Sequence, residues 1–115
     1  DRRLKSSIRY LPPGQLDNIM RLKPVSFIMK DDAKQQRELG LIAQDVEPVF
    51  PELVGTGDSN GMRSMNYIGL LSPMIAAMQE QQAEIERLRQ ENAALSRRMD
   101  ALEGKIRPPL RPYNP

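Results

Sequence analysis

The sequence of 115 residues contains no cysteine, no histidine and no tryptophan. Without cysteine no disulfide can form, although a domain this small usually needs some reinforcement of its core. Without histidine the commonest ligand for transition metals is missing and only carboxylates remain, so we expect neither a metal nor another cofactor. Association of several copies of the chain is the remaining source of stability.

Aromatic residues and excess charge of one sign are also scarce. The chain has two Phe and three Tyr, and its 17 basic and 15 acidic residues give a formal charge of +2. Neither stacking aromatics nor a basic patch is present, so we expect no nucleic-acid partner. No apolar run approaches the roughly 18–20 residues of a membrane span and no signal peptide leads the chain. We therefore expect no membrane partner and a soluble protein or fragment.

The first half of the head predicts one short helix and two strands. Residues 16–22 have the spacing of an amphipathic helix, which should end before Pro24 because the residue before proline avoids the α region. Residues 25–29 alternate between apolar and polar and predict a strand. Residues 31–38 are polar and predict a loop, and the apolar run 39–43 predicts a buried strand.

The second half of the head predicts a helical turn and a hairpin. Residues 44–50 favour a helical turn, and residues 53–54 begin another strand. Asn60-Gly61 is typical of a hairpin turn because both residues tolerate positive φ. Residues 62–67 would be the returning strand. The head is thus predicted to be of the α+β class.

Apolar residues after position 70 recur at alternating spacings of three and four over about five heptads, which is typical of a coiled coil. Ile85 at a and Leu88 at d, with Asn92 at a, favour two strands, whereas methionine at several a positions and Gln81 at d leave three strands open. The sequence thus predicts a parallel coiled coil whose seam, the set of a and d positions, comprises Leu71, Met74, Met78, Gln81, Ile85, Leu88, Asn92, Leu95, Met99, Leu102 and Ile106.

The residues that flank the seam favour parallel chains. Glu84 at g would face Arg89 at e of a neighbouring chain, and Arg98 would face Glu103 in the same way. Each such pair contributes little, about 0.3–0.5 kcal/mol, but like charges would have opposed a parallel arrangement.

Proline and serine positions suggest where the long helix begins and ends. Ser72-Pro73 is typical of a helix start, with serine as the cap, and Pro108-Pro109 ends the helix. The chain is thus predicted to have three parts: a globular head at 1–70, a coiled-coil helix at 71–107 and an extended proline-rich tail at 108–115.

Four motifs follow one another along the chain. Each alone is weak, but their order is specific. The first comprises Asp1, Leu4, Lys5 and Ile8; the second Leu16, Ile19, Leu22, Pro24, Val25 and Phe27; the third residues 40–54; the fourth Tyr67 and Leu70 before a helix with Ala77, Gln79 and Glu80.

In this order the motifs resemble the C-terminal intramolecular chaperone auto-processing domain, the peptidase S74 family of phage tail fibres, tailspikes and endosialidases. The resemblance covers residues 1 to about 82. It implies a homotrimer that guides folding of the upstream part of its own precursor and then cuts itself off. The family's dyad is a serine with a lysine base, and Lys5 stands at the place of that lysine.

The same resemblance implies that the scissile bond immediately precedes Asp1 and follows the missing serine. On this interpretation the chain is the released product, and no turnover is expected from it. A lysine amine acts as a base only when it is neutral, which requires desolvation or a nearby cation such as Arg2 or Arg3. Because a serine hydroxyl cannot easily attack its own carbonyl, we expect a site that is completed only in the oligomer.

The resemblance implies the host cytoplasm as the place of action during phage assembly, and the virion tail as the destination of the upstream part. Two alternatives remain at this point. One is a plain coiled-coil oligomerisation module without cleavage. The other is the same domain in a membrane-tethered transcription regulator.

Overall fold

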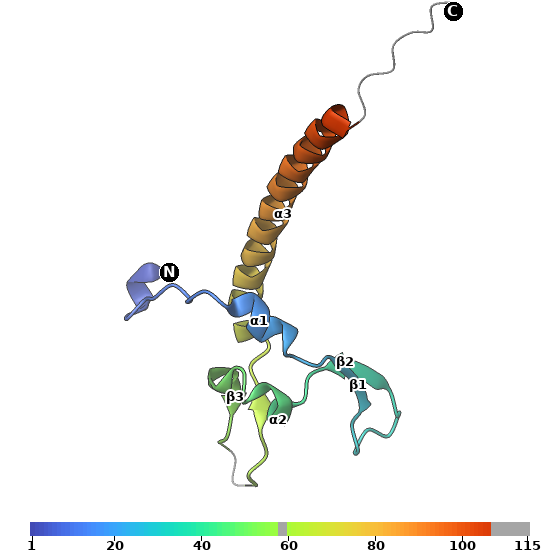
Figure 1. The fold of residues 1–115 in the computed structure, drawn as a ribbon. Helices are drawn as coiled ribbons and strands as arrows, with labels where there is room; N and C mark the ends of the chain where they lie inside the picture. Colours follow the sequence, from blue (N-terminus) through green and yellow to red (C-terminus); the bar gives the residue numbers. More distant parts are fainter. Residues whose placement is uncertain (58–59, 107–115) are drawn as a thin grey trace, which may run out of the picture. The chain divides into compact units, whose positions relative to one another are not determined.

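The computed structural model describes residues 1–57 and 60–106, so Arg107 and the predicted tail at 108–115 lie outside the described residues. The chain divides into two compact units, one up to Glu80 and one from Gln81 onward. The helices and strands follow in this order (Figure 1): a 3-10 turn Arg2–Leu4, α1 Gln15–Met20, β1 Val25–Ile28, β2 Arg37–Gly40, α2 Ala43–Val46, a 3-10 turn Pro51–Leu53, β3 Val54–Gly55, β4 Ser64–Met65, a 3-10 turn Ile68–Leu70 and α3 Leu71–Ile106.

Strands β1 and β2 form an antiparallel hairpin in which Val25 lies opposite Gly40 and Ile28 lies opposite Arg37. The strand predicted at 25–29 is therefore confirmed. The predicted loop at 31–38 is too long, because β2 already begins at Arg37. The buried strand predicted at 39–43 is wrong: β2 ends at Gly40, and Leu39, opposite Ser26, is 87% exposed. Apolar character alone does not say which face of a short strand is covered.

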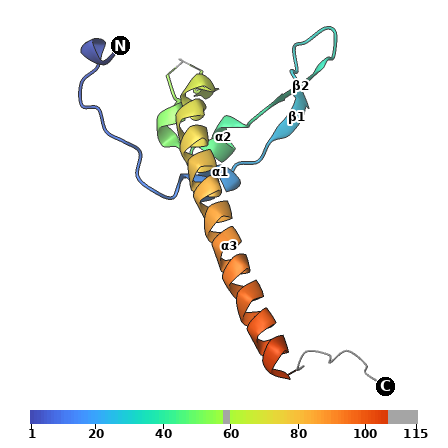
Figure 2. The same cartoon turned by 90° about the horizontal axis from the view of Figure 1, so that it is seen from above.

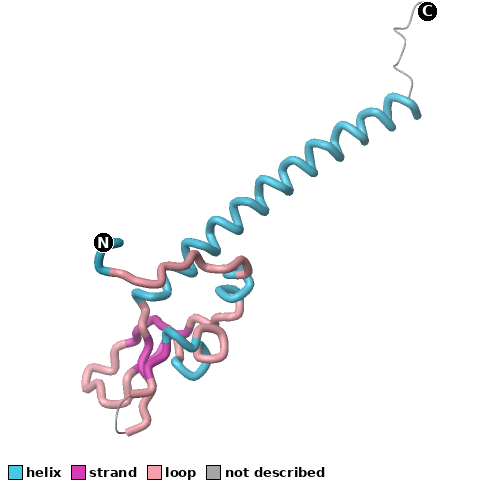
Figure 3. Tube along the Cα trace, turned by 90° about the vertical axis from the view of Figure 1, so that its left-hand side faces the viewer, coloured by secondary structure: helices cyan, strands magenta, loops and turns pink. Residues whose placement is uncertain are grey.

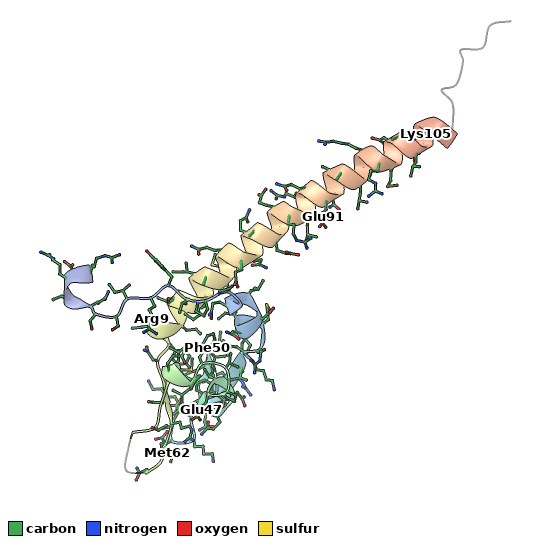
Figure 4. The ribbon with its side chains drawn as sticks, turned by 60° about the vertical axis from the view of Figure 1, so that its left-hand side comes forward. Arg9, Glu47, Phe50, Met62, Glu91 and Lys105 are labelled. Carbon is green, nitrogen blue, oxygen red and sulfur yellow. The ribbon has the colours of Figure 1, made fainter. Side chains whose placement is uncertain are left out.

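The core of the head is small and is built mainly from residues between α2 and the start of α3. Val46, Phe50, Leu53 and Leu70 are buried together, and partly buried side chains such as Ile19 pack against them. Phe50 lies within this region of the head (Figure 4). The predicted helix at 16–22 and helical turn at 44–50 are confirmed in shorter form by α1 and α2. The predicted strands at 53–54 and 62–67 shrink to the two-residue strands β3 and β4.

Helix α3 is 36 residues long and is the longest element of the described chain (Figure 3). The predicted start at Ser72-Pro73 is wrong, because the 3-10 turn Ile68–Leu70 runs directly into α3 at Leu71. Pro73 thus lies within the first turn of the helix. Proline is tolerated there because the first N–H groups of a helix have no intrahelical acceptor.

Candidate functional site

The first turns of α3 present two different faces. Pro73 and Ala77 are buried and Glu80 is partly buried, at the spacings of four and three that place residues on one face of a helix. Met74 and Met78 of the seam are 41% and 67% exposed. The head therefore packs on a face of α3 that leaves the predicted seam uncovered.

Exposed apolar seam residues continue along the second unit. The seven seam positions from Gln81 to Leu102 all carry exposed side chains in the single chain, and Ile106 is the last residue of α3. A continuous exposed apolar stripe on a long helix is typical of a surface that another chain covers. The apolar members are Ile85 at 37%, Leu88 at 45%, Leu95 at 52%, Met99 at 59% and Leu102 at 56% exposed.

The charged side chains of α3 pair with one another within the chain. Arg87 forms ion pairs with Glu84 and Glu91, and Arg89 reaches Glu86 at 3.5 Å. The hydrogen bond from Arg87 lowers the pKa of the Glu84 carboxyl, and Glu84 in turn raises the pKa of Arg87 above its usual value. These pairs lie three and four residues apart and support the helix itself.

Glu80 of α3 caps the N-terminus of α1. Its carboxylate accepts the backbone N–H of Leu16 at 2.5 Å and that of Gly14 at 2.6 Å. Figure 2 shows α1 beside the first part of α3. Gly14 precedes α1 with a φ of 101°, which favours glycine, and it has no side chain to cap the helix itself. The N–H groups of Leu16 and then Gly14 lower the pKa of Glu80, because they stabilise its charged form. Sequence reasoning noted Glu80 only as part of a motif and missed this contact across 64 residues.

Tyr67 joins the segment that leads into α3 to the residue that follows β2. Its hydroxyl accepts the N–H of Leu41 at 3.1 Å and donates to the C=O of Leu41 at 3.2 Å. A Cβ at Gly40 would lie 2.8 Å from that hydroxyl, so only glycine leaves room for the tyrosine. In the sequence, this tyrosine is marked only by the motif that places Tyr67 and Leu70 before a helix.

An open apolar groove of about 760 Å³ lies between α1, the β1–β2 hairpin and the start of α3. Its walls include Met20, Leu39 and Met74, which are 70%, 87% and 41% exposed. Because Met74 belongs to the seam as well, the groove and the seam form neighbouring apolar surfaces.

The predicted cleavage residues lie at the N-terminal 3-10 turn. Asp1 accepts the N–H of Arg3 at 2.9 Å, and its carboxylate pairs with the Arg3 guanidinium at 2.6 Å. Lys5 follows the turn and its N–H reaches the carbonyl of Arg2 at 3.1 Å. All residues from 1 to 14 are exposed. In the part of the chain that the structure describes, no hydrogen bond or ion pair engages the Lys5 side chain, so the single chain does not bring Asp1 and Lys5 together with a further catalytic group.

The described residues offer neither a metal site nor a membrane-spanning helix. Within residues 1–57 and 60–106, no three acidic side chains gather in a way that could hold a metal ion. None of the helices in this part of the chain is long and apolar enough to cross a membrane.

Comparison with known proteins shows two relatives and one family that this sequence resembles. The chain is 33% identical over 95 residues to the long tail fiber protein Gp37 of Enterobacteria phage M1 and, equally, to that of Enterobacteria phage Ox2. The alignment covers 77% of this chain and 38% of each relative, so the chain spans less than two fifths of their length. Residues 1–55 match the Peptidase_S74 family, described as chaperone of endosialidase. The resemblance that the four motifs predicted is confirmed by the match of residues 1–55 to the Peptidase_S74 family model and by the similarity to the two tail fibre proteins.

Proposed function

We propose that this chain is an intramolecular chaperone that forms a parallel homotrimer through α3 and guides folding of an upstream tail fibre chain. The observation that carries the proposal is the division of faces on α3: Pro73 and Ala77 hold the head, while the seam stays exposed. The family match at residues 1–55 and the similarity to tail fibre proteins support the same role.

A parallel coiled coil would hold three upstream chain ends together and in register. Encounter between separate chains is then replaced by a high local concentration, which lowers the entropic cost of starting an intertwined fibre. The exposed groove beside Met74 supports association of the heads as well as of the helices. The predicted division into a head at 1–70, a helix at 71–107 and a tail at 108–115 is part of this proposal.

The second part of the proposal is self-cleavage in the longer protein, at the bond between a serine and Asp1. One peptide bond and one water molecule give a carboxylate on the serine side and a new amine on Asp1. Lys5 would take the proton from the nucleophile and return it to the leaving amine. The Lys5 side chain is exposed in the single chain, so the desolvation that a neutral amine needs would come from another copy.

The test uses a longer precursor that carries the upstream residues and the expected serine. We expect a fragment that begins at Asp1, with a rate that depends on assembly, and no such fragment from Lys5→Ala. Mixing cleavable chains with serine-lacking chains should change the rate if the site is shared between copies. A precursor that is trimeric but uncut would leave only a plain coiled-coil oligomerisation module. A precursor that sediments as a single chain at micromolar concentration would overturn the templating role.

A further inference from the structure

Glu80 connects the N-terminal segment of the chain to the oligomerisation helix. The first N–H groups of any helix have no acceptor within the helix, and a carboxylate is a favourable partner for them. At α1 that carboxylate comes from Glu80, which accepts from Gly14 and Leu16 at 2.6 and 2.5 Å. Residues 1 to 14, which precede this contact, are all exposed.

The position of Glu80 on α3 suits this connection. With Leu71 at a, Glu80 stands at position c, between Met78 at a and Gln81 at d, and so outside the seam. It follows the buried residues Pro73 and Ala77 on the face that carries the head. One turn of α3 can therefore hold α1 through Glu80 and face another copy of the chain through Met78 and Gln81.

We propose that Glu80 is a positioning residue for cleavage: it fixes the start of α1 to α3, so that assembly of the helices sets where Asp1 and Lys5 of each copy lie. This inference rests on the proposed function. Lys5 lies nine residues before Gly14, which limits its distance from the contact to about 30 Å of extended chain.

Without the contact, the next described anchor of this segment is the buried Gln15, so the tether of Lys5 lengthens by only one residue. What is lost is the fixed direction in which the segment leaves α1, and a misplacement of about 1 Å can slow a reaction by up to about a hundredfold. We therefore expect cleavage to slow on the order of tenfold.

The experiment compares Glu80→Ala, Glu80→Gln and the control Glu86→Gln in the serine-containing precursor. Glu86 stands at position b of the same helix and pairs with Arg89, so its replacement changes charge without touching α1 or the seam. Oligomer mass, the cleavage rate on a gel and hydrogen exchange at the Gly14 and Leu16 amides are measured for each. Val54→Ala, a partly buried head substitution, reports what a general loss of stability does to the rate.

We expect Glu80→Ala to assemble like the unaltered chain, to lose protection at both amides and to cut on the order of tenfold more slowly. Glu80→Gln keeps one acceptor oxygen and should recover part of the rate. Glu86→Gln should match the unaltered chain, and Val54→Ala should not reproduce the loss. A Glu80→Ala precursor that has lost protection but cuts within twofold of normal overturns the inference and leaves the proposed function standing. An unaltered precursor that is never cut contradicts both the inference on Glu80 and the self-cleavage in the proposed function.

Discussion

The hydroxyl of Tyr67 is bonded to both backbone groups of Leu41, accepting its N–H at 3.1 Å and donating to its C=O at 3.2 Å. The Tyr67 side chain thus provides hydrogen-bond partners for both backbone groups of the residue that follows β2. Tyr67 itself belongs to the segment that leads into α3. The contact ties the hairpin to the base of the long helix across 26 residues.

Removing this hydroxyl should loosen the hairpin from the head. We expect Tyr67→Phe to lower the free energy of unfolding by about 1 kcal/mol, since water can replace part of the lost bonding at a ring that is 48% exposed. Urea unfolding measures the change, and amide exchange at Leu41 locates it. An unchanged Leu41 exchange rate would show that the two bonds do not hold the hairpin.

Substitution of Gly40 tests the same contact, because a side chain there would crowd the Tyr67 hydroxyl. A Cβ at Gly40 would meet the Tyr67 hydroxyl at 2.8 Å and a carbon of Phe27 at 3.1 Å, so we expect Gly40→Ala to cost about 1–3 kcal/mol. Gly104→Ala is the matched control, because its Cβ meets nothing within 4 Å. In a helix that change should instead stabilise by roughly 0.5–1 kcal/mol. Thermal unfolding of both variants should move in opposite directions.

The seam can be tested at a position within the second compact unit. We expect Leu95→Asp to dissociate the oligomer, because each copy loses about 1.5–3 kcal/mol of apolar burial and must place a charge against its neighbours. Ala94→Asp, at position c of the same turn, should keep the oligomer. Sedimentation equilibrium distinguishes a mass of three times 13.1 kDa from that of one chain. Equal behaviour of the two variants would contradict the seam.

Acid should release α1 from Glu80. Hydrogen bonds from Leu16 and Gly14 hold the pKa of Glu80 below its usual range in the folded state. A carboxyl with a lowered folded pKa stabilises the fold at pH values above the unfolded pKa of about 4.3, and that contribution disappears as the pH falls through the folded pKa.

The amide shift of Leu16 is the direct measurement for this transition. It should move with a midpoint below the usual glutamate range and should stay constant in Glu80→Gln. Glu84→Gln should keep the transition, since the low pKa of Glu84 comes from Arg87 instead. A Leu16 midpoint at or above the usual range would contradict the capping contact.

The parts of the structure that could be predicted from the sequence are those with a local cause. The period of α3, the strand at Val25–Ile28 and the short helix ended before Pro24 all follow from residues close to one another. The site was harder to predict. The contacts of Glu80 with Leu16 and of Tyr67 with Leu41 join distant segments by single side chains, and no periodic pattern marks them.

The face that holds the head ends at Glu80, and the second compact unit begins at Gln81. On the proposed trimeric assembly, a protein engineer could therefore graft a different three-stranded stalk onto this chain after Glu80, provided that the a and d positions continue from Met78 without a frame change. Such a chimera would turn the head into an interchangeable nucleation cap for trimeric fibres, with the strength of the stalk chosen independently.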